Sequence, residues 1–424
     1  MNDAHSPDGI RRLIHRGDRH QETMVFGSLD AQLAEDHRAR VVDDAVRAMD
    51  LREFYLGIAS TSGDGGRPAH DPHVLMGLWL LAILDGVGSA RELSRLVDEH
   101  IAYRWLAHGV SVSYHALSSF RVDHAAKLDR LLTQMIAGLV SEGLVTVERV
   151  AHDGMRVRAS AGAASFHRQT TLAEALVEAE GQIAALAREV HDQPGACTRR
   201  QRAARERAVR ERQERLTKAL ESAMELDAQR TAKEDPVRVS STDPEARVMK
   251  HGDGGFRPSF NVQLATDTGS QVIVGVAVTN RGSDLGEAAP MHQQVTERTG
   301  ILPKEYLVDG GFTKHADIER IDDAGTIVLA PVPKPKDPRR DRHEPLPDDS
   351  PAIAHWRMRM GQDANKILYH LRAATAECIN ALFRNRGMRA FTVRGKDKVH
   401  TCVLWQSLAH NLLRAAVLRS PVSA

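Results

Sequence analysis

The sequence predicts an α/β protein with a mixed sheet, an all-α N-terminal domain and an inserted antiparallel helical hairpin. Three patterns support this fold class. Apolar residues recur at helical spacing through residues 28–144, heptad spacing runs through residues 169–235, and strand-like alternation begins near residue 260. At 424 residues the chain exceeds what one hydrophobic core usually organises, so two or three domains are expected.

Composition and charge narrow the classes of function. The formal net charge is +1, so a nucleic-acid surface would have to come from local basic patches. Three scattered cysteines fit a reducing compartment and exclude a disulfide framework or a cysteine-based zinc site. The longest apolar run, residues 74–84, is too short to cross a bilayer, and the polar N-terminus has no signal-peptide pattern. We therefore expect a cytosolic protein with no membrane partner.

The N-terminal region predicts a basic arm followed by a series of helices. Ser89 and Ser113 are expected caps, and Asp71 with Pro72 forms an N-cap and first-turn pair. Short helices joined by tight turns, the last carrying Arg121, are typical of a helix-turn-helix that contacts DNA. Compact bundles without a ligand produce the same pattern, so both interpretations stay open. The expected helices span residues 29–51, 74–84, 90–99, 100–107, 114–124 and 126–142.

Residues 171–230 carry two heptad seams separated by a break at Pro194 and Gly195. The simplest interpretation is an antiparallel helical hairpin inserted into the main domain. Its second arm begins with an excess of arginines that includes Arg199 and Arg202. A solvated face and a set of phosphate contacts explain this charge equally well.

Two aspartates are expected to lie at strand ends. A β-branched run, residues 145–151, predicts a strand that ends at Asp153, where Gly154 allows a turn. A later strand ends at Asp309. Since the C-terminal ends of neighbouring parallel strands meet at one edge, we expect these two side chains to lie together. The other expected strands span residues 260–264, 272–278, 306–308 and 326–330, and a Pro-rich charged linker covers residues 331–351.

Other polar residues have structural explanations. Asp267 is predicted to shape a hairpin turn, and Asp284 with Glu287 resembles the capping box of a helix reaching residue 298. The histidines form no recognised metal-binding spacing, so they are interpreted as structural or surface residues. The residues concerned are His152, His315 and His410.

Residues 365–386 contain no Pro or Gly and predict a helix of about five turns that Gly387 ends. At about 100° per residue, one side is expected to face the core and the other to carry chemistry. The core side comprises Ile367, Leu368, Leu371, Ile379 and Leu382, and the chemical side comprises Tyr369, Arg372, Glu377, Asn380 and Arg384.

Asp153, Asp309 and Glu377 together suggest a metal-dependent site. Oxygen ligands of this kind suit Mg²⁺, which leaves coordination positions for water and substrate phosphate. Two such ions can stabilise the attacking and leaving oxygens of a phosphodiester. Without cations, the clustered carboxylates would raise one another's pKa.

Several segments resemble the bacterial insertion-sequence transposases with a ribonuclease-H-like DDE catalytic domain. The segment VAHDGMRVRAS is similar to the family's first-aspartate strand, and YLVDGGFTK to its second-aspartate segment. The segment YHLRAATAECINALFRNRGMRAFTVRG resembles the signature around the catalytic glutamate. Tyr369, Arg372, Glu377 and Arg384 match its Tyr, Arg, Glu and basic positions. The later LAHNLLR is also typical, and the segments over residues 28–51 and 70–121 resemble the family's DNA-binding region.

The resemblance implies a protein that cleaves the terminal inverted repeats of its element and joins the freed 3′-hydroxyl to target DNA. Asp153, Asp309 and Glu377 would be the catalytic and metal-binding residues for two Mg²⁺ ions, with Mn²⁺ as a substitute. Synapsis of two ends implies at least a homodimer on DNA, in the bacterial cytosol at the nucleoid. No Walker loop or dinucleotide fingerprint indicates a nucleotide cofactor. The expected DNA-binding residues are Tyr369, Arg372, Arg384, Arg394, Lys396, Arg121, Arg199 and Arg202.

Two alternative functions remain beside this one. A catalytically decayed, DNA-binding derivative would bind the same ends without cutting them, but all three carboxylates are intact. A glycoside hydrolase needs an acid pair flanking a sugar cleft, and only 4% of the residues are aromatic. The expected domains are a basic arm (1–27), a helical DNA-binding domain (28–144), the first catalytic strand (145–168), the hairpin (169–235), the ribonuclease-H-like core (236–332), the linker (333–362) and the C-terminal catalytic helix and tail (363–424).

Overall fold

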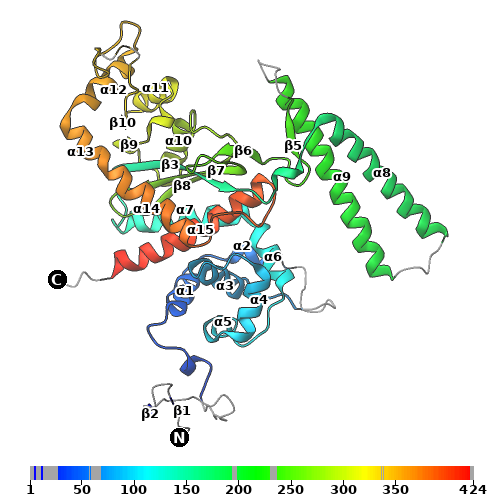
Figure 1. Cartoon of the computed structure of the whole chain (residues 1–424). Helices are drawn as coiled ribbons and strands as arrows, with labels where there is room; N and C mark the ends of the chain where they lie inside the picture. The colour runs from blue at the N-terminus through cyan, green and yellow to red at the C-terminus, as the bar shows by residue number, and fades with distance from the viewer. Residues whose placement is uncertain are drawn as a thin grey trace.

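A sheet flanked by helices forms the main body of the molecule. Short N-terminal helices pack on one side of this body, and a long helical hairpin projects from another (Figure 1). The basic arm predicted for residues 1–27 lies almost wholly outside the described residues, apart from the short strands β1 (Ala4–His5) and β2 (Arg11–Arg12). The computed structural model describes residues 4–5, 11–12, 27–56, 58, 68–192, 198–229, 236–335, 337 and 339–420.

The prediction of one helix over residues 29–51 is wrong, because local caps divide this segment. The ring Nδ1 of His37 accepts a hydrogen bond from the Ala39 N–H at 3.0 Å and starts a new helix. Asp50 then accepts from the Arg52 N–H at 3.2 Å and turns the chain again. The segment comprises a 3-10 turn (Asp30–Gln32), α1 (Arg38–Arg47) and α2 (Arg52–Tyr55).

The predicted caps of the following helices are confirmed. Asp71 accepts from the His73 N–H at 2.9 Å, while Ser89 and Ser113 each accept from the N–H three residues further on. Nearly every residue of α3 is buried, so this helix is the centre of the N-terminal bundle. The helices are α3 (Pro72–Leu84), α4 (Ala90–Glu99), α5 (Ile101–Leu106), α6 (Tyr114–Val122) and α7 (Ala125–Ser141).

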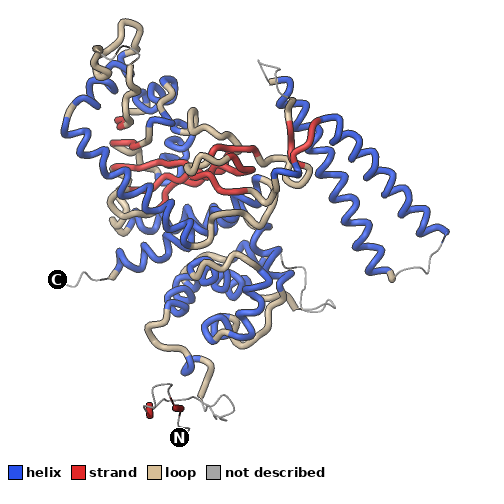
Figure 2. The backbone as a smooth tube through the Cα atoms, in the orientation of Figure 1, coloured by secondary structure: helices blue, strands red, loops and turns tan. Residues whose placement is uncertain are grey.

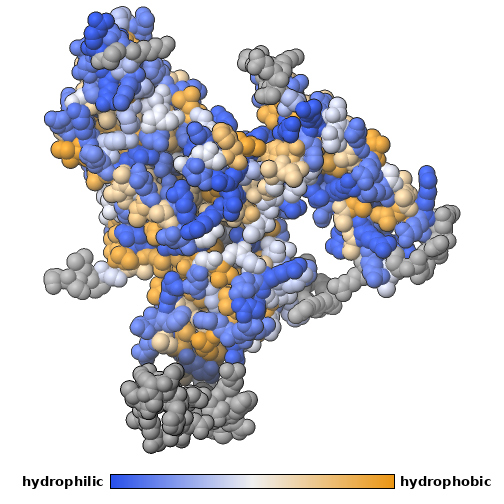
Figure 3. Space-filling model, in the orientation of Figure 1, coloured by the Kyte–Doolittle hydropathy of each residue, from blue (hydrophilic) through white to orange (hydrophobic). Residues whose placement is uncertain are grey.

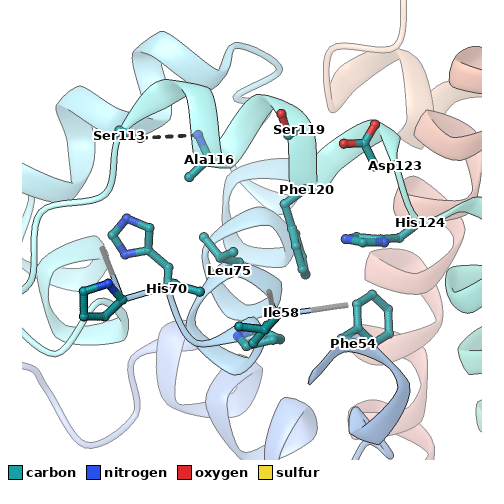
Figure 4. Close-up of a pocket in the computed structure, with 13 residues that line it drawn as sticks. Phe54, Ile58, His70, Leu75, Ser113, Ala116, Ser119, Phe120, Asp123 and His124 are labelled. Atoms are coloured by element: carbon teal, nitrogen blue, oxygen red, sulfur yellow. Dashed lines mark hydrogen bonds between the residues drawn. The ribbon is translucent and has the colours of Figure 1, made fainter. Parts of the chain in front are cut away.

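Aromatic packing positions α6 against the start of the bundle. The rings of Phe54, Phe120 and His124 lie with centroids 5.1–5.7 Å apart and line a pocket of about 430 Å³ (Figure 4). Ser113 caps α6 at the rim of the same pocket (Figure 4). Burial lowers the pKa of His124, which disfavours the charged form of this ring within the aromatic cluster.

The hairpin consists of two long helices that lie antiparallel. Arg205 approaches Glu189 at 3.6 Å and Arg212 approaches Glu178 at 3.0 Å, so the contacts run in opposite directions along the two arms. The arms enclose their own small core and project away from the sheet (Figure 2). Their outer surface mixes hydrophilic and hydrophobic side chains (Figure 3). The elements are β4 (Phe166–Arg168), α8 (Gln169–Asp192), α9 (Arg199–Ala228) and β5 (Arg238–Ser240), with β4 and β5 paired at the base.

The central sheet is mixed and has the order β10-β9-β3-β7, with β6 and β8 both paired to β7. β10, β9 and β3 run parallel, whereas β7 is antiparallel to β3, β6 and β8. Asp267 forms the β7–β8 turn as predicted, accepting from the Ser270 N–H at 2.8 Å. The strands are β3 (Arg149–Arg158), β6 (Arg247–Lys250), β7 (Phe256–Asp267), β8 (Ile273–Thr279), β9 (Glu305–Leu307) and β10 (Ile327–Leu329).

The prediction that the first strand spans residues 145–151 and ends at Asp153 is wrong. β3 begins four residues later, after Val147 with its φ of 53°, and continues five residues beyond Asp153. Gly154 makes no turn but pairs with Gln263 in β7. The strand continues because β7 is long enough to pair with β3 through Arg158, which only the tertiary partner decides.

Two predictions about the helices around the sheet are corrected. Asp284 caps no helix, and Glu287 precedes α10 without a side-chain capping bond. A helix, α12, also begins within the predicted linker, where Pro351 opens it and Trp356 donates from its indole N–H to the Ala330 carbonyl at 3.0 Å. These helices are α10 (Ala288–Thr299), α11 (His315–Asp323) and α12 (Pro351–Gly361).

The C-terminal helix α15 (Lys396–Arg419) is largely buried and packs against β8, α3 and α7. Within the LAHNLLR segment, Asn411 exchanges two hydrogen bonds of 2.8 Å with the backbone of Ile273 in β8. This helix therefore joins the N-terminal bundle to the sheet. In the described part of the chain, no helix combines the length and apolar character needed to span a membrane.

The helix predicted over residues 365–386 contains a π-helical segment, Ala373–Glu377, between α13 and α14. Gly387 ends it with a φ of 87°, as predicted. Before the π segment the predicted core side is wrong for Ile367, which is 69% exposed, and for Leu371, which is also exposed, whereas Leu368 packs against the core as predicted. The extra residue of a π turn shifts the facing of the helix, so predictions made at a constant 100° fail across it. The two flanking helices are α13 (Asp363–Arg372) and α14 (Cys378–Asn385).

Candidate active site

Strands β3 and β9 are parallel neighbours, as the sequence analysis expected of the strands that carry the two aspartates. Ala151 pairs with Leu307, so Asp153 and Asp309 each lie two residues further along. The register therefore directs both carboxylates to the same edge of the sheet. Asp309 also accepts from the Gly311 N–H at 2.7 Å, which begins a short 3-10 turn and turns the chain away after β9.

Arg372 contacts all three predicted carboxylates. Its Nη2 lies 2.9 Å from Oδ1 of Asp153 and 3.5 Å from Oδ2 of Asp309, and its Nη1 lies 3.8 Å from Oε1 of Glu377. Three carboxylates from distant parts of the chain thus meet around one guanidinium. Their shared contact defines the candidate active site.

Asp153 is held at both of its oxygens. Asn380 donates from Nδ2 to Oδ2 at 2.8 Å, while Arg372 donates to Oδ1. Arg372 and Asn380 lie on either side of the π segment, and both are buried against the sheet. The π turn therefore presents both donors to the same carboxylate, which is the kind of position at which π-bulges often occur.

The three carboxylates differ in exposure. Side-chain exposure rises from 14% for Asp153 to 40% for Asp309 and 65% for Glu377, so the site opens outward from the sheet. Burial raises the pKa of Asp153 to about 6; the Arg372 charge opposes this shift and the Asp309 charge adds to it. For Arg372, burial disfavours the charge, but Asp153, Tyr369 and Asp309 outweigh it and its pKa lies above the ordinary value.

The donor set fits a hard divalent cation by its chemistry. All three side chains offer carboxylate oxygens, and their combined negative charge exceeds the single positive charge of Arg372. In this conformation the guanidinium stands among them. Among the described residues, no three His, Cys, Asp or Glu side chains lie close enough to hold an ion together.

Asp284, predicted from the sequence to be a helix cap, belongs instead to the hydrogen-bond network of the candidate site. Its Oδ1 accepts from Asn261 and Gln263 at 2.7 Å each, and its Oδ2 accepts from Arg156 at 3.1 Å. The carboxylate also lies directly against Gly154, because a Cβ built there would stand 2.2 Å from Oδ1. One signal in the sequence could have indicated this role. Asn261 and Gln263 alternate with apolar residues along a strand that is buried on both faces, and buried amides need hydrogen-bond partners such as a carboxylate.

A hydrogen-bond chain continues from Asp284 behind Asp153. Gln263 bonds His152 at 2.7 Å through its Oε1, and the other ring nitrogen of His152 bonds the Tyr306 hydroxyl at 2.9 Å. Burial lowers the pKa of His152 to about 3, so the ring is neutral and can use one nitrogen as donor and the other as acceptor. The neighbours of Asp153 on both sides, His152 and Gly154, are thus fixed by the same network.

The other predicted DNA-binding residues fall into two groups. Tyr369 lies beside Arg372, and burial raises its pKa. Arg384 is exposed one turn beyond Asn380, and Arg394 and Lys396 are exposed on the following loop and at the start of α15. These four residues lie on the same C-terminal segment as Glu377.

The remaining three predicted residues lie elsewhere. Arg121 is half-buried, bonds the Gly88 carbonyl and stacks over the Trp79 ring at 4.9 Å, so it packs the N-terminal bundle. Arg199 and Arg202 lie on the first turn of α9, in the hairpin, with Arg202 already engaged in an interaction within the protein. The structure therefore brings Tyr369 to the candidate site and leaves these three away from it.

The raised pKa of Asp153 predicts a pH dependence of stability in metal-free buffer. Between about pH 4 and pH 6 the folded state keeps a proton that the unfolded state has lost, so the free energy of unfolding should fall as pH rises. The expected loss is roughly 2–3 kcal/mol across this range. It would be measured with a chelator present as the difference between the wild-type and Asp153→Asn denaturation curves. A flat difference between pH 4 and 7 would contradict the assignment.

Comparison with known protein families identifies the class. Residues 27–123 match a family described as a transposase domain. Residues 200–412, half of the chain, match the family described as a transposase DDE domain. Asp309 and Glu377 lie within the second match, whereas Asp153 lies between the two. No curated protein matches the chain.

The chain therefore belongs to the DDE transposases of insertion sequences. Membership indicates a role in DNA transposition, with DNA as the partner and, in general for this family, divalent metal ions as cofactors. This confirms the resemblance drawn from the sequence.

Proposed function

We propose that the chain is an active transposase in which Asp153, Asp309 and Glu377 are the catalytic carboxylates. The contact of Arg372 with all three is the observation that supports this best. The proposed reaction is phosphodiester cleavage at terminal inverted repeats, followed by transfer of the freed 3′ end into target DNA. The sheet, with β9 and β10 parallel to β3 and β7 antiparallel to it, supports a ribonuclease-H-like fold for the catalytic domain.

In this proposal the three carboxylates hold two Mg²⁺ ions, for which Mn²⁺ can substitute. When bound, the ions would stabilise the attacking and leaving oxygens of the displacement. Asn380 keeps the buried Asp153 oriented while the more exposed Asp309 and Glu377 face the DNA. Arg372 gives up part of its contact with the carboxylates and donates instead to a phosphate oxygen, a role that its forked guanidinium suits.

The remaining contacts in the proposal concern DNA. Tyr369 and Arg384 flank the carboxylates and would contact the strand at the cut. Arg394 and Lys396 would extend this contact along the backbone, and two element ends would require at least two copies of the chain. The projecting hairpin, with its arginine-rich second arm, supports either a grip on DNA or a contact between copies.

The proposal is tested with the DNA that brackets the gene. Purified full-length chain is incubated with end fragments and a target plasmid in Mg²⁺, in Mn²⁺, in Ca²⁺ or with a chelator. We expect cuts with 3′-hydroxyl ends at the element boundary, and joined products, in Mg²⁺ and Mn²⁺ only. Binding of the ends without any cut or joined product in either ion would refute catalysis and favour the decayed, DNA-binding derivative.

A further inference from the structure

A basic hollow of about 310 Å³ lies beside the candidate active site, between β3, the β6–β7 turn and the end of α14. Five arginine side chains line this arginine pocket, and they come from three segments far apart in the chain. They are Arg156, Arg158, Arg257, Arg384 and Arg389.

Three of these cations have no acidic counterpart in the part of the chain that the structure describes. The pocket's one lining carboxylate, Asp253, accepts from both terminal nitrogens of Arg257 at 2.7 and 2.8 Å, which lowers the pKa of Asp253. Arg156 shares its Nη2 between Asp284 and the Gly282 carbonyl. Among the residues that the structure describes, no carboxylate lies within 4 Å of the guanidinium groups of the other three arginines, Arg158, Arg384 and Arg389.

The walls of the pocket are joined by backbone hydrogen bonds. The Arg158 carbonyl accepts from the Phe391 N–H at 2.8 Å, and the Arg158 N–H donates to the Arg389 carbonyl at 3.4 Å. Arg389 also donates from Nε to the Arg384 carbonyl at 3.4 Å. Like charges held together on fixed backbone repel one another, so this arrangement favours an anion that neutralises them.

The pocket is close to the carboxylates along two elements. Asn380 bonds Asp153, and Arg384 follows it by one helical turn, roughly 6 Å along the axis. On β3, Arg156 lies three residues past Asp153, roughly 10 Å along the strand. Successive phosphates of one DNA strand rise roughly 3.4 Å along the axis, so the pocket stands a few nucleotides from the cut.

We propose that the arginine pocket binds the backbone phosphates of the DNA strand a few nucleotides from the scissile bond, with Arg158 and Arg389 as its principal ligands. This inference rests on the proposed function and names the subsite that fixes the strand's path past Asp153. Two guanidinium groups that line one pocket from β3 and from the turn after α14 match the forked recognition of nonbridging phosphate oxygens. The contact is independent of base sequence.

The test compares Arg158→Gln/Arg389→Gln with Arg339→Gln/Arg340→Gln, which removes the same charge from exposed residues of the predicted linker. Binding of full-length chain to an end duplex is followed by fluorescence anisotropy at several salt concentrations. We expect the pocket variant to weaken binding about tenfold or more and to reduce the slope of log K against log salt by about 2, at roughly 0.9 per lost phosphate contact. The control variant should keep the wild-type slope.

A second arm uses wild-type protein and modified DNA. Single methylphosphonates, each removing one phosphate charge, are placed at six positions on either side of the cut. We expect one or two adjacent positions at which the modification weakens wild-type binding but has no further effect on the pocket variant; positions contacted by other residues should weaken binding of both proteins. An unchanged salt slope in the variant, or equal sensitivity of both proteins at every position, would overturn the proposal.

Failure of the proposed catalysis would remain distinguishable. The binding measurements do not require cleavage and can be repeated with Asp153→Asn protein. Suppose that Asp153→Asn leaves cleavage unchanged while the pocket variant shows the reduced slope of log K against log salt. The catalytic assignment then fails and the phosphate subsite stands. If Asp153→Asn abolishes cleavage but the pocket variant keeps the wild-type slope of log K against log salt, the subsite alone fails.

Discussion

Asp153→Asn should reduce strand cleavage at the element ends by at least about a thousandfold, while end binding stays within about threefold of wild type. The amide keeps the shape of the side chain and can still accept from Asn380, but it loses the negative charge that the proposed site uses to bind cations. A thousandfold loss corresponds to about 4 kcal/mol of transition-state stabilisation. Single-turnover cleavage of labelled end duplexes in Mg²⁺ measures the loss.

A matched substitution separates the site from a general charge effect. Asp322 on α11 lies outside the site and pairs with Arg359 of α12 at 3.7 Å. Asp322→Asn therefore removes the same charge at a different place. We expect this control to cleave at the wild-type rate. If the cleavage rate of Asp153→Asn lies within tenfold of the rate of the control, Asp153 is not a catalytic carboxylate.

Gly154→Ala adds a single methyl group to the candidate site and is expected to reduce both stability and cleavage strongly. The new Cβ would stand 2.2 Å from Oδ1 of Asp284 and 2.7 Å from Nε2 of Gln263, both held in a buried network. Relieving this overlap must break hydrogen bonds or displace β3, at about 2–4 kcal/mol of unfolding free energy. Cleavage should fall about a hundredfold, because a displacement of order 1 Å at Asp153 misplaces the reacting groups.

The matched control is Gly162→Ala, where no atom lies within 4 Å of the added Cβ and φ is −88°. It should change the unfolding midpoint and the cleavage rate little. In the double variant Gly154→Ala/Asp284→Ala the overlap with the Asp284 carboxylate is removed, which leaves only the Gln263 amide close to the new Cβ. The double variant should therefore lose less unfolding free energy than the two single variants lose in sum. Thermal unfolding and single-turnover cleavage test both points. A Gly154→Ala protein as stable and active as the control would contradict this account.

Local sequence determined much of the secondary structure. Asp71, Ser89 and Ser113 cap their helices as predicted, and Gly387 ends the long helix, because these choices depend on a few neighbouring backbone groups. β3 and β9 are parallel neighbours, which is the arrangement that the predicted meeting of Asp153 and Asp309 required. Membership of the DDE transposases could be recognised from the segments around Asp153, Asp309 and Glu377.

Long-range contacts decided the features that sequence patterns mispredicted. β3 runs through Asp153 because β7 pairs with it as far as Arg158, and Asp284 turns to buried amides on β7 instead of capping a helix. Ile367 is exposed because the π segment changes the facing of the helix, an alteration that a constant helical period cannot represent.

The sequence by itself determined which residue types the chain carries at each position and how each short segment folds. The tertiary structure alone decided that Arg372 reaches three distant carboxylates, that Asn380 and Asp284 support the strand of Asp153, and that arginines from three segments line one pocket. The physical reason is that a side chain's environment, including its burial, charge neighbours and hydrogen-bond partners, is supplied by segments that meet only when the whole sheet has formed.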